Sequence, residues 1–396
     1  MDIKLSKGFY YLVLTAMILF FIADAANKYL DVYSTGLSLS IYIRFLFELL
    51  FIASTILILK KSILELYLSL GILFLCFSIG QAILLYNNYE DWGDFFVNVK
   101  IFNKYIFFFV LYPVVEYILD KNSTLLNKLV NAFYFLFLMN IIISFFGFLA
   151  ESELVRSYPL RERFGYSGLI PKRNEATLFY LLGLTIAYVR FILLRKKERI
   201  LFFLSLLGCI MLGTKGIYIF LIFLFLFHIR TNKKLVKRLF ISGFLLIFLG
   251  VLIIPQTQVY NYYHSQAQRI GILTMLLSGR DIIFYDEITT ITDNWNFINI
   301  LFGGQNQNDK AFEMDFFDLF FFFGFIGSFL YIELMTKLFF KVKDNISFQH
   351  FFIWSYFFIA FFGGHFFSSA VNSLYFVIIV LYIFKSGLIK EKSSIS

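Results

Sequence analysis

The sequence predicts an all-α polytopic membrane protein. Of the 396 residues, 60% are hydrophobic and 15% are charged, whereas soluble domains contain roughly 45–50% apolar and 25% charged residues. The apolar residues form runs of about 20, the length that an α-helix needs to cross a bilayer. Lys and Arg gather in short loops on one side of these runs, as the positive-inside rule predicts. The net charge of +9 therefore indicates membrane orientation and no nucleic-acid partner.

About twelve runs satisfy the length rule. The seventh and eighth are separated by residues 213–216 alone, so one of them is expected to be short or kinked. The first run resembles a signal peptide, but the many runs after it favour an uncleaved helix. The predicted spans lie near residues 8–24, 37–59, 64–86, 101–119, 127–149, 174–194, 199–213, 214–229, 237–256, 316–337, 350–364 and 372–386.

The basic loops fix the predicted orientation. If the spans alternate, the Lys and Arg clusters of the short loops all lie on one face, which is the cytoplasm, and both termini lie there too. Residues 1–396 then form one integral membrane domain. Three longer segments face outside: about 87–100, a smaller loop at about 150–173 and a large loop at about 257–315.

The outer loops contain cations that the sorting rule disfavours outside. Such a cluster suits an anionic ligand, although pairing with nearby Glu residues is the alternative. Pro171 and Asn174 predict a capped helix start that would place Arg173 beside free backbone N–H groups, an arrangement that suits phosphate. The candidate cations are Arg161, Arg163, Lys172 and Arg173 in the smaller loop and Arg280 in the larger one.

The segment from Ser278 to Asp281 reads as a capping box that starts a helix over about 280–292. Apolar residues among polar neighbours indicate that this helix lies along the membrane surface. Arg280 in its first turn is therefore a second anion contact.

Arg44 lies inside the second span, one helical turn from Glu48. Ionisable groups at that depth normally face a cavity or one another. Arg44 is expected either to pair with Glu48 or to reach an anionic ligand in an outer cavity.

Three residues are candidates for acid–base chemistry. Glu313 and Asp315 precede the tenth span, where partial desolvation is expected to raise a carboxyl pKa and suit a general base for a sugar hydroxyl. Favouring the helix dipole is the alternative role for these acids. His365, at the outer end of the eleventh span, would orient an acceptor or bind phosphate, or else form hydrogen bonds inside the bundle.

In this order, the features resemble those of the O-antigen and capsular polysaccharide polymerases of the Wzy type, a family related to the O-antigen ligases. The resemblance covers most of the chain in topology, and its informative residues lie between about 161 and 370. Ligases usually carry His-Asn eleven and ten residues before a Gly-Φ-Ile-Gly helix, where this chain has Glu313 and Met314. The acidic version favours a polymerase and leaves the identity of the catalytic base open. The matching motifs are Arg161, Arg163, Gly165, Gly168, Pro171 and Asn174, then 212–216, Ser278-Gly279-Arg280, Phe302-Gly303-Gly304 and Gly324-Phe325-Ile326-Gly327.

The resemblance implies a GT-C-like fold in the bacterial cytoplasmic (inner) membrane, with the active site facing the periplasm or exterior. It implies inverting glycosyl transfer without metal or cofactor. The donor would be a glycan on undecaprenyl pyrophosphate and the acceptor a lipid-linked repeat unit, giving O-antigen of lipopolysaccharide or capsule. Whether a chain-length regulator protein is a further partner stays open.

The resemblance also implies roles for individual residues. The cations would hold the pyrophosphate, and Glu313, helped by Asp315 or His365, would take the proton from the attacking hydroxyl. The surface around 316–323 would guide the polyprenyl tails. The pyrophosphate-binding set is Arg44, Arg161, Arg163, Lys172, Arg173 and Arg280.

Two other functions compete with this interpretation. A transporter or flippase of lipid-linked oligosaccharides would have a similar number of spans, but it favours internal repeats and charges near the bilayer midplane. An O-antigen ligase would share the donor chemistry and move the finished glycan to a non-prenyl acceptor.

Overall fold

The computed structural model describes residues 2–33, 39–87, 91–159, 163–231, 258–305, 312–342 and 347–386. Within these ranges the regular secondary structure is helical, apart from one isolated bridge between Arg156 and Tyr166. Seven of the described helices are long and apolar enough to cross a membrane. These are α1 (Asp2–Tyr33), α2 (Leu39–Ile56), α3 (Lys61–Tyr86), α4 (Trp92–Lys121), α5 (Ser123–Leu149), α6 (Arg173–Tyr188, continued by a π-turn over Val189–Leu193) and α14 (Asp315–Phe339).

Shorter apolar helices complete the bundle: α7 (Arg199–Leu212), α8 (Lys215–Thr231), α15 (Ser347–Phe362) and α16 (Ser373–Phe384). The predicted all-α, multi-pass membrane architecture is therefore confirmed at this level. The ninth predicted span, 237–256, lies outside the described residues.

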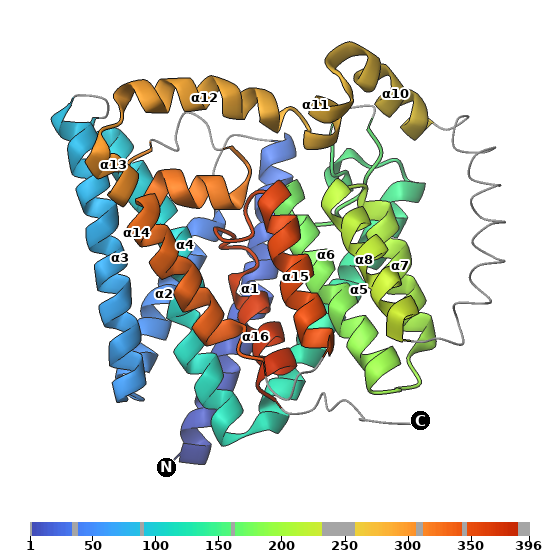
Figure 1. Ribbon diagram of the computed structural model, residues 1–396. Helices are drawn as coiled ribbons and strands as arrows, with labels where there is room; N and C mark the ends of the chain where they lie inside the picture. Colours follow the sequence, from blue (N-terminus) through green and yellow to red (C-terminus); the bar gives the residue numbers. More distant parts are fainter. Residues whose placement is uncertain are drawn as a thin grey trace.

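Four helices lie in a row across one end of the bundle (Figure 1). We call this end the loop face. The N-terminus of α1 and the C-terminus of α16 lie at the opposite end. The helix predicted over about 280–292 is confirmed as α12, and it runs across the bundle end. The row consists of α10 (Gln258–Ile270), α11 (Ile272–Leu277), α12 (Arg280–Asn294) and α13 (Phe297–Phe302).

The prediction of an outer loop over 87–100 is wrong for the second half of this segment. Helix α4 already begins at Trp92, because a capping box forms ahead of it. The Asp91 carboxylate accepts a hydrogen bond from the backbone N–H of Asp94 at 2.9 Å, and Asp94 returns the contact to Asp91. This reciprocal cap satisfies two N–H groups that a helix start otherwise leaves free.

The predicted break between the seventh and eighth spans is confirmed at Gly213. This residue ends α7 in the left-handed conformation, with φ 72°, and α8 starts two residues later. A Cβ atom at this position would lie 2.4 Å from the carbonyl oxygen of Phe164. Glycine at this position therefore lets the turn between α7 and α8 lie directly against the smaller loop at about 150–173.

Helix α14 bends within the predicted span 316–337. Gly324 has φ 68° and ψ −171°, and the helix runs across the bundle before it and along the bundle after it (Figure 1). The backbone of Phe302 and Gly303 fills the space at this bend. The crossing segment carries Phe321, Phe322 and Phe323 into the core, so the predicted tail-guiding surface over 316–323 is wrong for these three rings.

The centre of the core is α16. All twelve of its residues are buried, and the helix packs against α4, α5, α6 and α14. The hydroxyl of Tyr375 donates to the carbonyl of Met17 in α1 at 2.9 Å. A non-helical stretch over 363–372 returns the chain from the end of α15 to this central helix, and it brings His365 into the site described next.

Candidate functional site

Arg280 and Glu313 form an ion pair at the loop face. The guanidinium Nη2 of Arg280 donates to Oε2 of Glu313 at 3.2 Å, and Nη1 donates to the carbonyl of Phe362 at 2.9 Å. The Arg280 side chain is 13% exposed, whereas that of Glu313 is 48% exposed. The cation is therefore enclosed between the start of α14 and the end of α15, while the carboxylate reaches solvent.

Glu313 and His365 both adopt left-handed backbone conformations, with φ 55° and 70°. Their segments are pressed together: a Cβ on Gly364 would lie 2.7 Å from Cα of Glu313, and the N–H of Asp315 donates to the carbonyl of Gly363 at 3.3 Å. Non-glycine residues in this conformation store strain that the surrounding structure must offset. Two such residues on segments in direct contact mark this junction as a candidate site.

Two buried aspartates hold the junction in place. Oδ2 of Asp315 accepts from the backbone N–H groups of Phe366 at 2.7 Å and Phe367 at 3.3 Å. Asp318, which is not predicted from the sequence, accepts from the N–H groups of Phe312 and Met314 at 2.8 and 3.1 Å. Asp315 thus faces the 363–372 stretch, whereas Glu313 faces Arg280.

The charges around Glu313 decide its ionisation. Partial burial acts to raise the pKa of Glu313, but the positive charge of Arg280, the charge that His365 acquires in acid and the hydrogen bond from Arg280 outweigh it, and the pKa lies below its usual value. The raised pKa predicted for Glu313 is therefore wrong, because the neighbouring cations outweigh desolvation. Glu313 is ionised at neutral pH.

His365 is neutral at the same pH. Burial lowers the pKa of its imidazole and the charge of Lys172 lowers it further, while Glu175 and Glu313 act in the opposite direction. A neutral imidazole beside an ionised carboxylate can donate or accept a hydrogen bond.

Two arginines of the smaller loop, at about 150–173, lie near the same aromatic ring. The guanidinium carbons of Arg163 and Arg173 lie 4.0 and 5.1 Å from the ring centroid of Tyr158. Arg173 is the first residue of α6, and its charge reaches Glu313. The predicted cap by Asn174 is wrong, because α6 begins one residue earlier, at Arg173, and has no side-chain cap.

Lys215 joins these cations from the start of α8. Its ammonium donates to Oγ of Ser278 at 2.9 Å and to the carbonyl of Met275, and it lies within electrostatic range of Arg163 and Arg280. Ser278 therefore does not form the predicted capping box: it ends α11 with φ 61°. Lys215 is not among the predicted site residues, although its place directly after the Gly213 turn is visible in the sequence.

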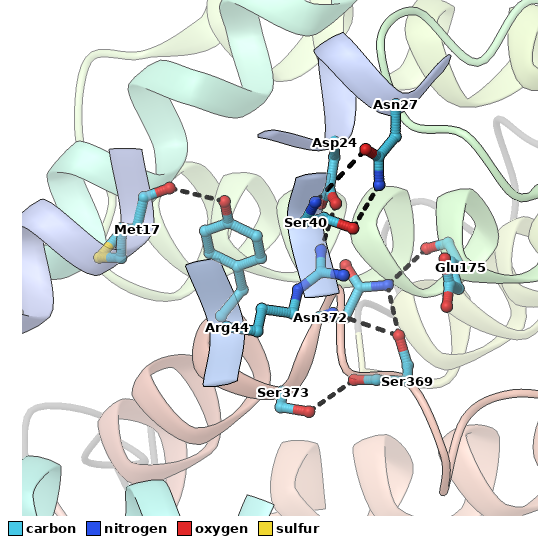
Figure 2. A network of polar contacts seen from close by, with 10 residues as sticks. Met17, Asp24, Asn27, Ser40, Arg44, Glu175, Ser369, Asn372 and Ser373 are labelled. Atoms are coloured by element: carbon cyan, nitrogen blue, oxygen red, sulfur yellow. Dashed lines mark hydrogen bonds and ion pairs between the residues drawn. The ribbon is translucent and has the colours of Figure 1, made fainter. Parts of the chain in front are cut away.

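Arg44 pairs with Asp24 inside the bundle (Figure 2). The predicted pairing of Arg44 with Glu48 is wrong, since Glu48 accepts instead from Asn103 at 2.7 Å. In the same network the side chain of Asn372 donates to the backbone carbonyl of Glu175 at 2.7 Å. The Asp24–Arg44 ion pair joins α1 to α2. The Asn372 contact joins the start of α16 to α6.

The structure thus gathers most of the predicted residues that it describes and separates one. Arg44 is bonded to Asp24, and Arg161 lies outside the described residues. Among the described residues, no group of three His, Cys, Asp or Glu is placed to hold a metal ion. The residues linked at the loop face by contact or by charge are Arg163, Lys172, Arg173, Lys215, Arg280, Glu313, Asp315 and His365.

Comparison with known proteins adds no relative: no family model, no curated protein and no solved structure matches this chain.

Proposed function

We propose that this protein is a membrane glycosyltransferase that polymerises undecaprenyl-pyrophosphate-linked repeat units into a surface polysaccharide, O-antigen or capsule. The observation that carries the proposal is the half-exposed Glu313 carboxylate bonded to Arg280 within a group of cations. A carboxylate suits deprotonation of a sugar hydroxyl, and clustered guanidinium groups suit a diphosphate. The motif order resembling the Wzy-type polymerases supports the same assignment.

The reaction requires both kinds of group at once. The acceptor hydroxyl oxygen attacks the anomeric carbon of the donor glycan from the face opposite the pyrophosphate. The new C–O bond forms as the bond to pyrophosphate breaks, and the pyrophosphate leaves with the electron pair. Arg163, Arg173, Lys215 and Arg280 stabilise the charge that develops on it. Glu313 takes the proton of the attacking hydroxyl.

The ion pair gives Glu313 a role that depends on the donor. While Arg280 bonds to Glu313, the carboxylate is ionised but weakly basic, because its pKa is below the usual value. A bound pyrophosphate competes for the same guanidinium and neutralises its charge. The pKa of Glu313 then rises toward the range of an effective base, so the base is activated only when the donor is present.

The proposal includes the topology. Twelve spans would place both termini in the cytoplasm and the loop face outside the cytoplasmic membrane. That is the side on which a lipid-linked repeat unit is available after translocation.

The deciding experiment is complementation of a deletion strain with Arg280→Ala or Glu313→Gln, scored by the ladder of surface glycan lengths. Arg156→Ala is the matched control, since Arg156 lies on the same loop face and pairs with Glu153 at 2.7 Å. We expect both site variants to give single repeats and the control to restore long chains.

Long chains from both site variants would overturn the site assignment. Finished chains that stay on the prenyl carrier would point to the ligase. Lipid-linked repeats retained on the cytoplasmic side would point to the flippase.

A further inference from the structure

An exposed aromatic stripe runs along α15. Trp354, Phe358, Phe361 and Phe362 are separated by four, three and one residues, so they occupy one side of the helix. Their exposed fractions are 76%, 41%, 40% and 37%. Phe358 and Phe362 lie 5.1 Å apart between ring centroids, so the rings form a continuous surface. We call these four residues the α15 stripe.

The C-terminal end of the α15 stripe, at Phe362, lies beside the candidate site. The carbonyl of Phe362 accepts the hydrogen bond from Arg280 at 2.9 Å. The ring of Phe361 lies 5.7 Å from that of Phe317, four residues after Glu313. From there the stripe extends eight residues along the bundle, a rise of about 12 Å.

The neighbouring helix brings a second cation to the same end. Phe358 packs against Phe223 of α8 with ring centroids 5.0 Å apart. Helix α8 starts with Lys215, which lies within electrostatic range of Arg280. The α15 stripe therefore has a cationic end and an apolar length, the shape of a site for a lipid with an anionic head.

The stripe places a Trp away from the depth at which Trp is usually found. Trp is enriched at the membrane–water interface, whereas Trp354 lies halfway along α15 and is its most exposed large side chain. Exposed rings occur on other helices too, such as Phe74 on α3 and Phe135 and Phe146 on α5, but the α15 stripe ends beside Arg280. Rigid aromatic faces offer a large contact area at low entropic cost to a chain lying on them.

Part of the surface over 316–323 is closed to the tail. Phe322 and Phe323, within the segment predicted to guide polyprenyl tails, have no exposed area. They pack against Tyr105 of α4 at centroid distances of 5.3 and 5.2 Å.

We propose that the α15 stripe binds the first isoprene units of a polyprenyl pyrophosphate whose diphosphate lies at Arg280 and Lys215. The inference rests on the proposed function and adds the path of the lipid. An isoprenoid chain is apolar, unsaturated and methyl-branched, and the attached diphosphate matches the cations at the C-terminal end of the stripe.

The test compares two soluble probes on the full-length protein in an uncharged detergent: inorganic pyrophosphate and farnesyl pyrophosphate. Calorimetry gives the Kd of each for the parent, for Trp354→Ala/Phe358→Ala and for the control Phe135→Ala. Phe135 is a lipid-exposed ring on α5, 61% exposed and remote in sequence from the site.

We expect farnesyl pyrophosphate to bind the parent more tightly than pyrophosphate does. The double variant is expected to lose about tenfold in affinity for farnesyl pyrophosphate, or about 1.4 kcal/mol, because it removes two of the rings that contact the isoprene units. Its Kd for pyrophosphate is expected to stay unchanged, which shows that the site still folds. The Phe135 variant is expected to match the parent with both probes.

Each contrary result has one meaning. If the parent binds neither probe, the proposed function itself is contradicted. If the parent binds pyrophosphate and the double variant binds farnesyl pyrophosphate as tightly as the parent does, only the assignment of the lipid to the α15 stripe is contradicted. An equal loss in the Phe135 variant would trace the extra affinity to the detergent micelle, and this also overturns the inference.

Discussion

Arg280 bonds to Glu313 across 33 residues of sequence, with Nη2 and Oε2 3.2 Å apart. The same guanidinium reaches the carbonyl of Phe362 through its other terminal nitrogen. One side chain therefore joins the start of α12, the approach to α14 and the end of α15. In the proposed mechanism, the pKa of Glu313 depends on whether Arg280 bonds to Glu313 or to a bound pyrophosphate.

Replacing Arg280 by Lys is expected to be less harmful than replacing it by Ala. Lysine keeps the charge but lacks the planar fork that bonds to two acceptors at once. We expect Arg280→Ala to lower the rate of glycosyl transfer by about 10²–10³-fold, the usual loss for one preorganised donor, and Arg280→Lys to retain an intermediate rate. Single-turnover transfer with purified protein measures this. Equal rates for the two variants would show that charge alone contributes nothing at this position, and a parental rate for Arg280→Lys would show that the fork geometry is irrelevant.

Acid is expected to destabilise the protein in two stages. The folded pKa of His365 lies below its ordinary value of about 6.5, so the unfolded chain takes up a proton first as pH falls through that value. Stability therefore decreases from about pH 6.5 downward. Glu313, whose pKa is also depressed, contributes stability above about pH 4.3 that is lost below it.

Thermal unfolding between pH 2 and 8 measures both stages. His365→Asn is expected to remove the first decline and leave the second. The control His264→Asn changes an exposed residue of α10 and is expected to keep both. A parent whose Tm is constant from pH 7 to 5 would contradict the assignment to His365.

Asp315 is expected to matter mainly for stability. Asp315→Ala would leave the buried N–H groups of Phe366 and Phe367 without their acceptor, at a cost of about 2–3 kcal/mol. Asp315→Asn keeps one carbonyl oxygen and should cost less. Chemical or thermal unfolding of the purified variants gives the order, and an alanine variant as stable as the asparagine variant would argue against this role.

The bend in α14 makes a paired prediction for two glycines. A Cβ on Gly324 would lie 2.3 Å from the backbone nitrogens of Gly303 and Phe302, and its φ is 68°. Gly324→Ala is therefore expected to lower Tm strongly. Gly71→Ala, in α3 with nothing within 4 Å of the added atom, is expected to stabilise the helix by about 0.5–1 kcal/mol. Equal effects of the two substitutions would show that the bend is not required.

The buried pair Asp24 and Arg44 is expected to be non-additive. Arg44→Met alone leaves a carboxylate buried without its partner, at about 3–5 kcal/mol. Asp24→Leu combined with Arg44→Met removes both charges and is expected to cost less than the sum of the single changes. A double-mutant cycle by thermal unfolding measures the coupling. Additive losses would mean that the two groups do not interact.

The spans and the outline of the site could be predicted because both depend on local signals. Run length and hydropathy locate the apolar helices, within a few residues for α5, although α1 and α4 begin well before their predicted spans. Arg280, Glu313 and His365 carry charge or a titratable ring just outside apolar runs, so alternation of the spans places them at one face. The structure adds the contacts that make them a group.

The rest depends on partners distant in sequence. A four-residue spacing favours Glu48 for Arg44, but the true partner, Asp24, is on another helix. Ser278 has the sequence of a cap, yet its hydroxyl accepts from Lys215, 63 residues away. The low pKa of Glu313 likewise follows from Arg280 and His365, which no local pattern places beside it.

The burial of α16 bears on how the protein is made. This helix has at most 4% exposure at every residue, and its Tyr375 bonds to α1, which leaves the ribosome long before it. Domains generally acquire structure from the N-terminus during synthesis, yet here the central helix emerges after the helices that surround it. Until it arrives, the sides of α4, α5 and α6 that contact α16 lack that partner. A nascent chain that stops before Ser373 would keep an empty centre, which gives the cell's proteases a physical mark of an unfinished molecule.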